Sequence, residues 1–145
     1  MLVFDIETDG LLNELSKIHT MTIYDTQTKQ YKRYDKEHTS EGVARLDGAE
    51  VCGHNIIAFD IPAIKKLYPS FKPKNVLDTL VMARLALADI KELDLAKKNI
   101  STKLYGSHSL RAWGERLGVL KGELWRDYGL ARVEQRDERL LRAGR

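Results

Sequence analysis

Apolar and polar residues alternate with two different periods along the chain, and these periods predict where strands and helices lie. A period of two predicts three strands, over residues 2–7, 18–25 and 29–35. The second and third are separated by a short turn, which predicts an antiparallel hairpin. The third alternates lysine or arginine with tyrosine or glutamine, so we expect it at a solvent-facing sheet edge.

Helical spacing becomes common after residue 40. It predicts a short helix over residues 40–46, with Ser40 as its N-cap, and a buried strand over residues 50–55 follows. Apolar residues then recur at helical spacing from Phe59 to Leu67. A strand hairpin followed by strands that alternate with helices indicates an α/β domain with a mixed sheet.

Two further helices and one loop complete the predicted elements. Asp78 is a good N-cap for a helix in the segment DTLVMARLAL. Residues 89–106 are mixed and polar, which predicts a loop or a mobile insertion. The segment SHSLRAWGERLG predicts an amphipathic helix capped by Ser107 or Ser109 and ended by Gly118. Its predicted apolar stripe consists of Leu110, Trp113 and Leu117.

Composition limits the class of protein. The 145 residues are 43% apolar and 31% charged, as expected of one globular domain. No apolar run approaches the ~20 residues of a membrane-spanning helix, and the first residues do not have the pattern expected of a secretory signal. The single cysteine, Cys52, forms no internal disulfide, so we expect a cytoplasmic protein. The net charge of +3 is compatible with a polyanionic partner.

The first strand carries two carboxylates, Asp5 and Glu7. Residues i and i+2 of a strand point to the same face, so these side chains are expected side by side, with Ile6 in the core. Close carboxylates repel unless one is protonated or a cation lies between them, and hard oxygen ligands favour Mg²⁺ or Mn²⁺. The alternative is an ordinary solvated strand face.

A third carboxylate, Asp60, is predicted at the junction between the buried strand and the next helix, preceded by Asn55 and Phe59. By itself it can be explained by stabilisation of the helix dipole, and Asn55 by a turn. The joint pattern of D-x-E on a strand and N-x-x-x-F-D at a strand–helix junction is far less common by chance.

Four segments together resemble a known family. The sequences DIETDGLL, GHNIIAFDIPAI, VLDTLVMARL and GSHSLRAWGERLGVLKGE are similar to the 3′–5′ proofreading exonuclease domain of short phage-type family A DNA polymerases, within the DEDD exonuclease superfamily. The resemblance covers residues 1–123 and implies a ribonuclease H-like fold. Family members are fused to a polymerase domain that these 145 residues do not contain.

The resemblance also implies a mechanism and a site. Asp5, Glu7 and Asp60 would hold two Mg²⁺ or Mn²⁺ ions that support hydrolysis at a single-stranded DNA 3′ end. The terminal nucleotide would be held by Thr8 to Leu11, with Leu11 against its base. Asn55 and Phe59 would support the substrate strand.

The family's third motif, Tyr-x-x-x-Asp, does not follow Asp60 in this sequence. The position four residues after each later tyrosine is Lys72, Ser109 or Arg132. Residues 124–145 depart from the family and contain six of the 11 arginines but no lysine. Back-translation of residues 128–145 permits Tyr-Cys-Glu-Gln-Asp in another frame, so we expect a truncated domain with a frameshifted tail.

The functional prediction is therefore a metal-dependent 3′–5′ exonuclease domain of impaired activity, which binds one ion or none. The alternative is a catalytically inactive nucleic-acid-binding or vestigial prophage domain. Self-association as a homodimer, with another chain covering an exposed face, is a third possibility. The C-terminal helix of the ribonuclease H-like fold is expected to be missing, or to be replaced by residues 124–145.

Overall fold

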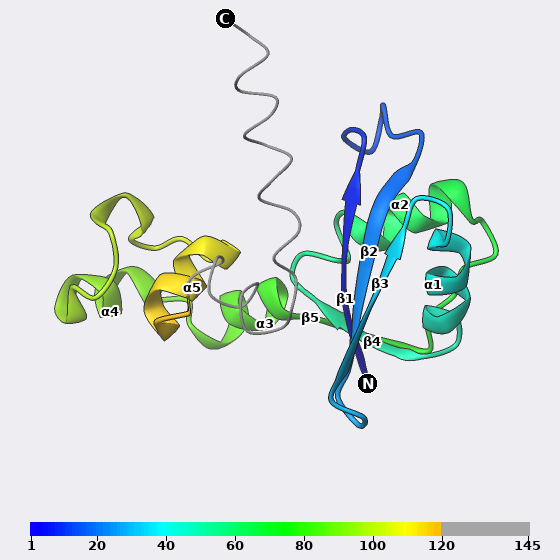
Figure 1. Cartoon of the computed structure of the whole chain (residues 1–145). Helices are drawn as coiled ribbons and strands as arrows, with labels where there is room; N and C mark the ends of the chain where they lie inside the picture. The colour runs from blue at the N-terminus through cyan, green and yellow to red at the C-terminus, as the bar shows by residue number, and fades with distance from the viewer. Residues whose placement is uncertain (120–145) are drawn as a thin grey trace, which may run out of the picture. The chain divides into compact units, whose positions relative to one another are not determined.

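The computed structural model describes residues 1–119, and its strands form one mixed five-stranded sheet in the order β3-β2-β1-β4-β5 (Figure 1). The mixed sheet with flanking helices confirms the predicted α/β class. The chain divides into two compact units, residues 1–88 and 89–145, and all five strands belong to the first. The strands are β1 (Leu2–Thr8), β2 (Ile18–Asp25), β3 (Gln30–Asp35), β4 (Glu50–Gly53) and β5 (Asn75–Asp78).

Strand β1 lies at the centre of the sheet. It pairs antiparallel with β2, which pairs antiparallel with β3, so the predicted hairpin is confirmed. On its other side β1 runs parallel to β4, and β4 runs parallel to β5. The carboxyl ends of β1 and β4 therefore reach the same end of the sheet, which is where open α/β sheets usually bind ligands.

The hydrophobic core lies on one face of this sheet. Met21 and Ile23 of β2 have no exposed surface and lie beside Phe4 and Ile6 of β1. Helices α1 (Thr39–Leu46) and α2 (Asp60–Leu67) add apolar residues to the same cluster. Between them they bury Val43, Leu46, Ile61, Ala63 and Ile64.

The prediction that Ser40 caps α1 is wrong. The cap position is His38, which makes no side-chain capping bond. The chain leaves β3 through a turn in which the Asp35 carboxylate accepts hydrogen bonds from the backbone N–H groups of Glu37 and His38. Because this turn is so tight, the helix begins directly after it and Ser40 falls inside the first turn.

Helix α3 (Thr79–Ala86) begins at Asp78, whose carboxylate accepts hydrogen bonds from the N–H groups of Leu80 and Val81, as predicted for an N-cap. None of the residues of α3 is buried. Together with the edge strand β5 the helix exposes a set of large apolar side chains. They are Val76, Leu77, Val81, Met82 and Leu85.

The second unit corrects the prediction of a loop over residues 89–106. It contains helix α4 (Ile90–Lys97) and a short 3₁₀ helix, η1 (Thr102–Leu104). Asp94 of α4 is buried, and its carboxylate accepts hydrogen bonds from Arg116 at 2.8 and 2.9 Å and from Gly106 N at 2.9 Å. Asp94, one of the polar residues that predicted a loop, thus forms a buried ion pair with Arg116 of the following helix, and this pair orders the segment.

Helix α5 (Leu110–Leu117) has the predicted ends. Ser109 accepts a hydrogen bond from Ala112 N, and Gly118 adopts a left-handed φ of 68°. The predicted apolar stripe is not buried in the described residues, since Leu110 and Leu117 are 61% and 70% exposed.

The predictions for residues 124–145, including a missing or replaced C-terminal helix, lie outside the described residues. Within residues 1–119, no helix is both long enough and apolar enough to cross a bilayer.

Candidate active site

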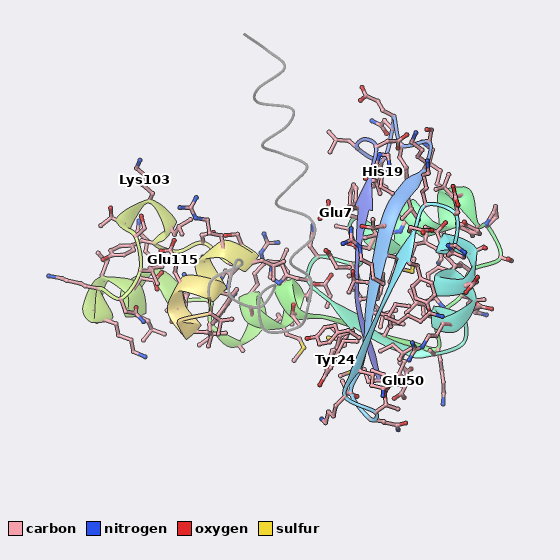
Figure 2. The ribbon with its side chains drawn as sticks, in the orientation of Figure 1. Glu7, His19, Tyr24, Glu50, Lys103 and Glu115 are labelled. Carbon is pink, nitrogen blue, oxygen red and sulfur yellow. The ribbon has the colours of Figure 1, made fainter. Side chains whose placement is uncertain are left out.

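Asp5 and Glu7 both project from the sheet face opposite the core. Phe4 and Ile6 are buried, whereas the residue that follows each of them, Asp5 and Glu7, is exposed. Figure 2 shows Glu7 on the side of the sheet away from α1. The alternation places both carboxylates on one solvent-facing surface, near the carboxyl end of β1.

Asp60 is joined directly to the strand that carries these two residues. It is the first residue of α2, is only 5% exposed, and its Oδ1 accepts a hydrogen bond from Ile6 N at 3.2 Å. Ile6 lies between Asp5 and Glu7, so this bond fixes the start of α2 against the acidic part of β1. The bonded positions are 54 residues apart in the sequence, so the bond is a tertiary contact.

Burial of Asp60 and the negative charge of Asp5 raise the pKa of the Asp60 carboxyl to about 7, although the bond from Ile6 N opposes the shift. A buried carboxylate near a second carboxylate is unfavourable in the ionised form. A cation held by both groups would favour ionisation of both. Asp5 and Asp60 are therefore chemically suited to share a divalent ion.

The three predicted ligands are not equally close. Asp5 and Asp60 interact electrostatically, but no group of three or more His, Cys, Asp or Glu within residues 1–119 is arranged to hold a metal ion. Glu7 shares the face of Asp5 without completing such a group.

The segment that precedes α2 is held by Asp78. One carboxylate oxygen accepts a hydrogen bond from Asn55 N at 2.9 Å and the other from Ile57 N at 3.0 Å. Burial raises the pKa of Asp78, but the four backbone N–H groups outweigh it and leave the pKa below its usual value. Asn55 has a left-handed φ of 65°, so this anchorage holds a conformation that few residues adopt. Asn55 and Phe59, which precede Asp60 in the sequence, are both half-buried.

Replacing Asp78 with asparagine is expected to lower the free energy of unfolding by roughly 2–3 kcal/mol. The amide has a single acceptor oxygen, so an N–H group of the loop or of α3 loses its bond to a charged partner. Urea denaturation would measure the loss. Asp47→Asn is the matched control, because Asp47 is exposed and accepts a hydrogen bond from Lys72 N. An equal loss in the two variants would contradict the anchoring role.

Gly53, at the end of β4, allows the strand to pass close to β1. A Cβ atom there would lie 2.4 Å from Ile56 Cγ2 and 2.8 Å from the backbone oxygen of Phe4. We expect Gly53→Ala to destabilise the protein by roughly 1–3 kcal/mol in thermal unfolding. Gly10→Ala is the control, because its Cβ would meet nothing closer than 3.4 Å. A tolerated Gly53→Ala would show that β1 and β4 can separate.

Two contacts hold the loop that carries Leu11. The Asp9 carboxylate accepts hydrogen bonds from the hydroxyl and N–H of Ser16, which, with Lys17 N, hold its pKa well below the usual value. Lys66 of α2 donates to the backbone oxygens of Leu12 and Asn13 at 2.8 and 3.2 Å. The Leu11 side chain remains 73% exposed.

The role of Lys66 could not be predicted from the sequence. The pair Lys65-Lys66 reads as a solvated charge run, and no local pattern connects Lys66 with a loop more than fifty residues earlier. Thr8 was expected to hold the terminal nucleotide, and in the structure its hydroxyl donates to Gly10 O at 2.9 Å. This bond shapes the turn after β1.

Comparison with known proteins identifies the family of the chain. A family model described as the RNase_H superfamily matches residues 2–135. The chain is 35% identical over 156 residues to the DNA-directed DNA polymerase of Escherichia phage T7, and 34% identical over 153 residues to that of Enterobacteria phage T3. Each comparison covers 95% of this chain, which spans 22% of the length of either polymerase. The predicted ribonuclease H-like fold and the resemblance to phage polymerases are thus confirmed.

Proposed function

Because the chain belongs to the ribonuclease H superfamily, we propose that it is a divalent-metal-dependent 3′–5′ exonuclease domain acting on single-stranded DNA. The superfamily and the similarity to two DNA polymerases support a nuclease-type domain. The direction of cleavage, the metal and the preference for a single strand are parts of the proposal.

One observation carries the proposal most directly. Asp60 is buried at the start of α2, bonded to Ile6 N, and close enough to Asp5 for the charge of Asp5 to raise its pKa. A structural role in capping the helix does not require a second carboxylate beside it. The pair is explained better as a site that binds a cation.

We propose that Asp5 and Asp60 hold Mg²⁺ or Mn²⁺, and that Glu7, on the same face as Asp5, contributes through a bound water. A bound ion would supply an activated water and charge stabilisation at the phosphate. The protein itself supplies the position of the DNA end. The exposed Leu11 lies against the terminal base, Thr8 shapes its loop, and Asn55 and Phe59 contact the strand.

The activity is expected to be low, because no Tyr-x-x-x-Asp follows Asp60 within the 145 residues. The same observation favours a second candidate, a domain that binds nucleic acid without cleaving it. We also propose that residues 124–145 are a frameshifted tail, the first part of which lies within the family match over residues 2–135. The gene sequence tests this directly, and a downstream region without Tyr-x-x-x-Asp in any other frame would contradict it.

Incubation of the whole chain with a 5′-labelled single-stranded oligonucleotide and Mn²⁺ tests the function. We expect stepwise shortening from the 3′ end, release of nucleoside 5′-monophosphates, and no reaction in EDTA. Internal cleavage would contradict the exonuclease proposal. Binding without shortening would support the second candidate, and neither result, with a dimer in sizing, would favour self-association.

A further inference from the structure

The face of the sheet that carries Asp5 and Glu7 continues across β2 and β3. The register aligns Asp5 with Thr22 and Thr22 with Arg33, and paired residues of antiparallel strands share a face. Two residues nearer the amino end of β1, and on the same face, Val3 aligns with Tyr24, and Tyr24 aligns with Tyr31. The acidic site, an arginine and two tyrosines therefore lie on one surface, which we call the outer face.

The two tyrosines form an aromatic pair on the outer face. Their ring centroids are 4.4 Å apart, and Tyr31 is 44% exposed while Tyr24 is partly exposed. Figure 2 shows Glu7 near the upper end of the sheet and Tyr24 near its base. With strands about 4.8 Å apart and about 6.8 Å between alternate residues, the pair lies a short distance from Asp5. A base that stacks on the pair would lie within a few nucleotides of an end held at Asp5.

Arg33 gives the outer face a cation at the height of Asp5, about 10 Å away across two strands. Asp35, the acidic residue of β3, accepts hydrogen bonds from the N–H groups of Glu37 and His38 and is hydrogen-bonded to the His38 ring. Lys32 points the other way, with its ammonium 4.6 Å from the centre of the buried Tyr34 ring and 3.8 Å from Glu41. Arg33 is therefore the cation of β3 that lies on the outer face, where a phosphate of the bound strand would pass.

We propose that the outer face of β2 and β3 is a binding track for the single-stranded nucleic acid that leads to the acidic site. Bases stack on Tyr24 and Tyr31, and a backbone phosphate pairs with Arg33. Aromatic platforms interleaved with cations bind single strands without sequence preference, as trimming of any 3′ end requires. The inference rests on the proposed function for its direction, but its binding surface can be tested separately.

Binding of 5′-fluorescein dT3 and dT12 to the whole chain, followed by anisotropy in EDTA, tests the track without hydrolysis. We expect Tyr31→Ala and Arg33→Ala to weaken binding of dT12 roughly tenfold and that of dT3 by a smaller factor, because the short oligonucleotide covers only the part of the track nearest Asp5. Arg33→Ala should also reduce the slope of log K against log salt by about 0.7. Thermal unfolding verifies that each variant is folded.

Lys32→Ala is the matched control for charge, since it removes a cation from the same strand on the opposite face. Tyr31→Phe is the matched control for fold, since it keeps the ring. Both should bind dT12 as the parent does. An equal effect of Lys32→Ala, equal losses for dT3 and dT12, or no binding of dT12 would overturn the track.

The two proposals fail in different ways. Absence of 3′ shortening with Mn²⁺, together with the expected pattern of dT12 binding, would overturn the exonuclease and leave the track. Tyr31→Ala that lowers stability but leaves dT12 binding unchanged would reduce the tyrosines to a cross-strand pair that stabilises the hairpin.

Discussion

Asp5→Asn is expected to reduce the residual rate of 3′ shortening at least tenfold, to the level of the EDTA control, and to leave the fold intact. Asp5 is exposed on the outer face, so the neutral amide disturbs no core contact. The substitution removes one of the two negative charges that would hold a shared cation, and loss of a member of a concerted site lowers the rate. The measurement is single-turnover shortening of a 5′-labelled oligonucleotide with Mn²⁺.

A matched pair of substitutions separates this effect from a general loss of negative charge. Glu7→Gln removes a carboxylate beside Asp5, whereas Glu50→Gln makes the same change at the amino end of β4, where Glu50 accepts a hydrogen bond from Asn75. Figure 2 shows these two glutamates at opposite ends of the sheet. We expect Glu7→Gln to lower the rate at least tenfold and Glu50→Gln to leave it unchanged. Comparable rates in all three variants would place the chemistry elsewhere.

Asp60→Asn is expected to make the metal-free protein more stable at pH 8. Burial and the charge of Asp5 raise the pKa of Asp60 from 3.8 to about 7, so the folded protein binds this proton more tightly than the unfolded chain does. The protonated group therefore favours folding, and stability decreases as the pH rises from about 4 to 7. Such a shift lowers the free energy of unfolding by at most about 4 kcal/mol. The neutral amide of Asn avoids this loss, and its oxygen still accepts the hydrogen bond from Ile6 N.

Thermal unfolding in EDTA at pH 5 and pH 8 measures this effect. The parent should unfold at a lower temperature at pH 8 than at pH 5, and Asp60→Asn should remove most of the difference. Added Mn²⁺ should stabilise the parent at pH 8 but not the variant, because the ion binds only the folded site. A variant that is less stable than the parent at pH 8 would show that the ionised carboxylate is favourable where it lies.

The sequence predicted the parts of the fold that depend on local pattern. Alternation placed Asp5 and Glu7 on one face of β1, and the preference of aspartate for N-cap positions identified the start of α3 at Asp78. The prediction of a loop over residues 89–106 was wrong, because Asp94 and Arg116 are 22 residues apart and their pairing has no local signature. Polar composition cannot distinguish a solvated loop from a buried ion pair.

The site was predictable only to the level of its motifs. The D-x-E and N-x-x-x-F-D patterns identified the acidic residues, but the bond from Ile6 N to Asp60 depends on how α2 packs against β1. Arg33 and Tyr31 could not be connected with Asp5, since their alignment depends on the register of β1, β2 and β3. A shift of one residue in either pairing would move them to the core face.

The two edges of the sheet differ in how readily they accept another strand. The β3 edge carries two consecutive cations, Lys32 and Arg33, one on each face of the sheet. Their charges oppose pairing with a second copy of the same strand. The β5 edge is four residues long and exposes Val76 and Leu77 beside the unburied helix α3. Aggregation, and any pairing between copies, should therefore start at β5, so a charged residue in place of Val76 is the first change to make if the protein is poorly behaved at high concentration.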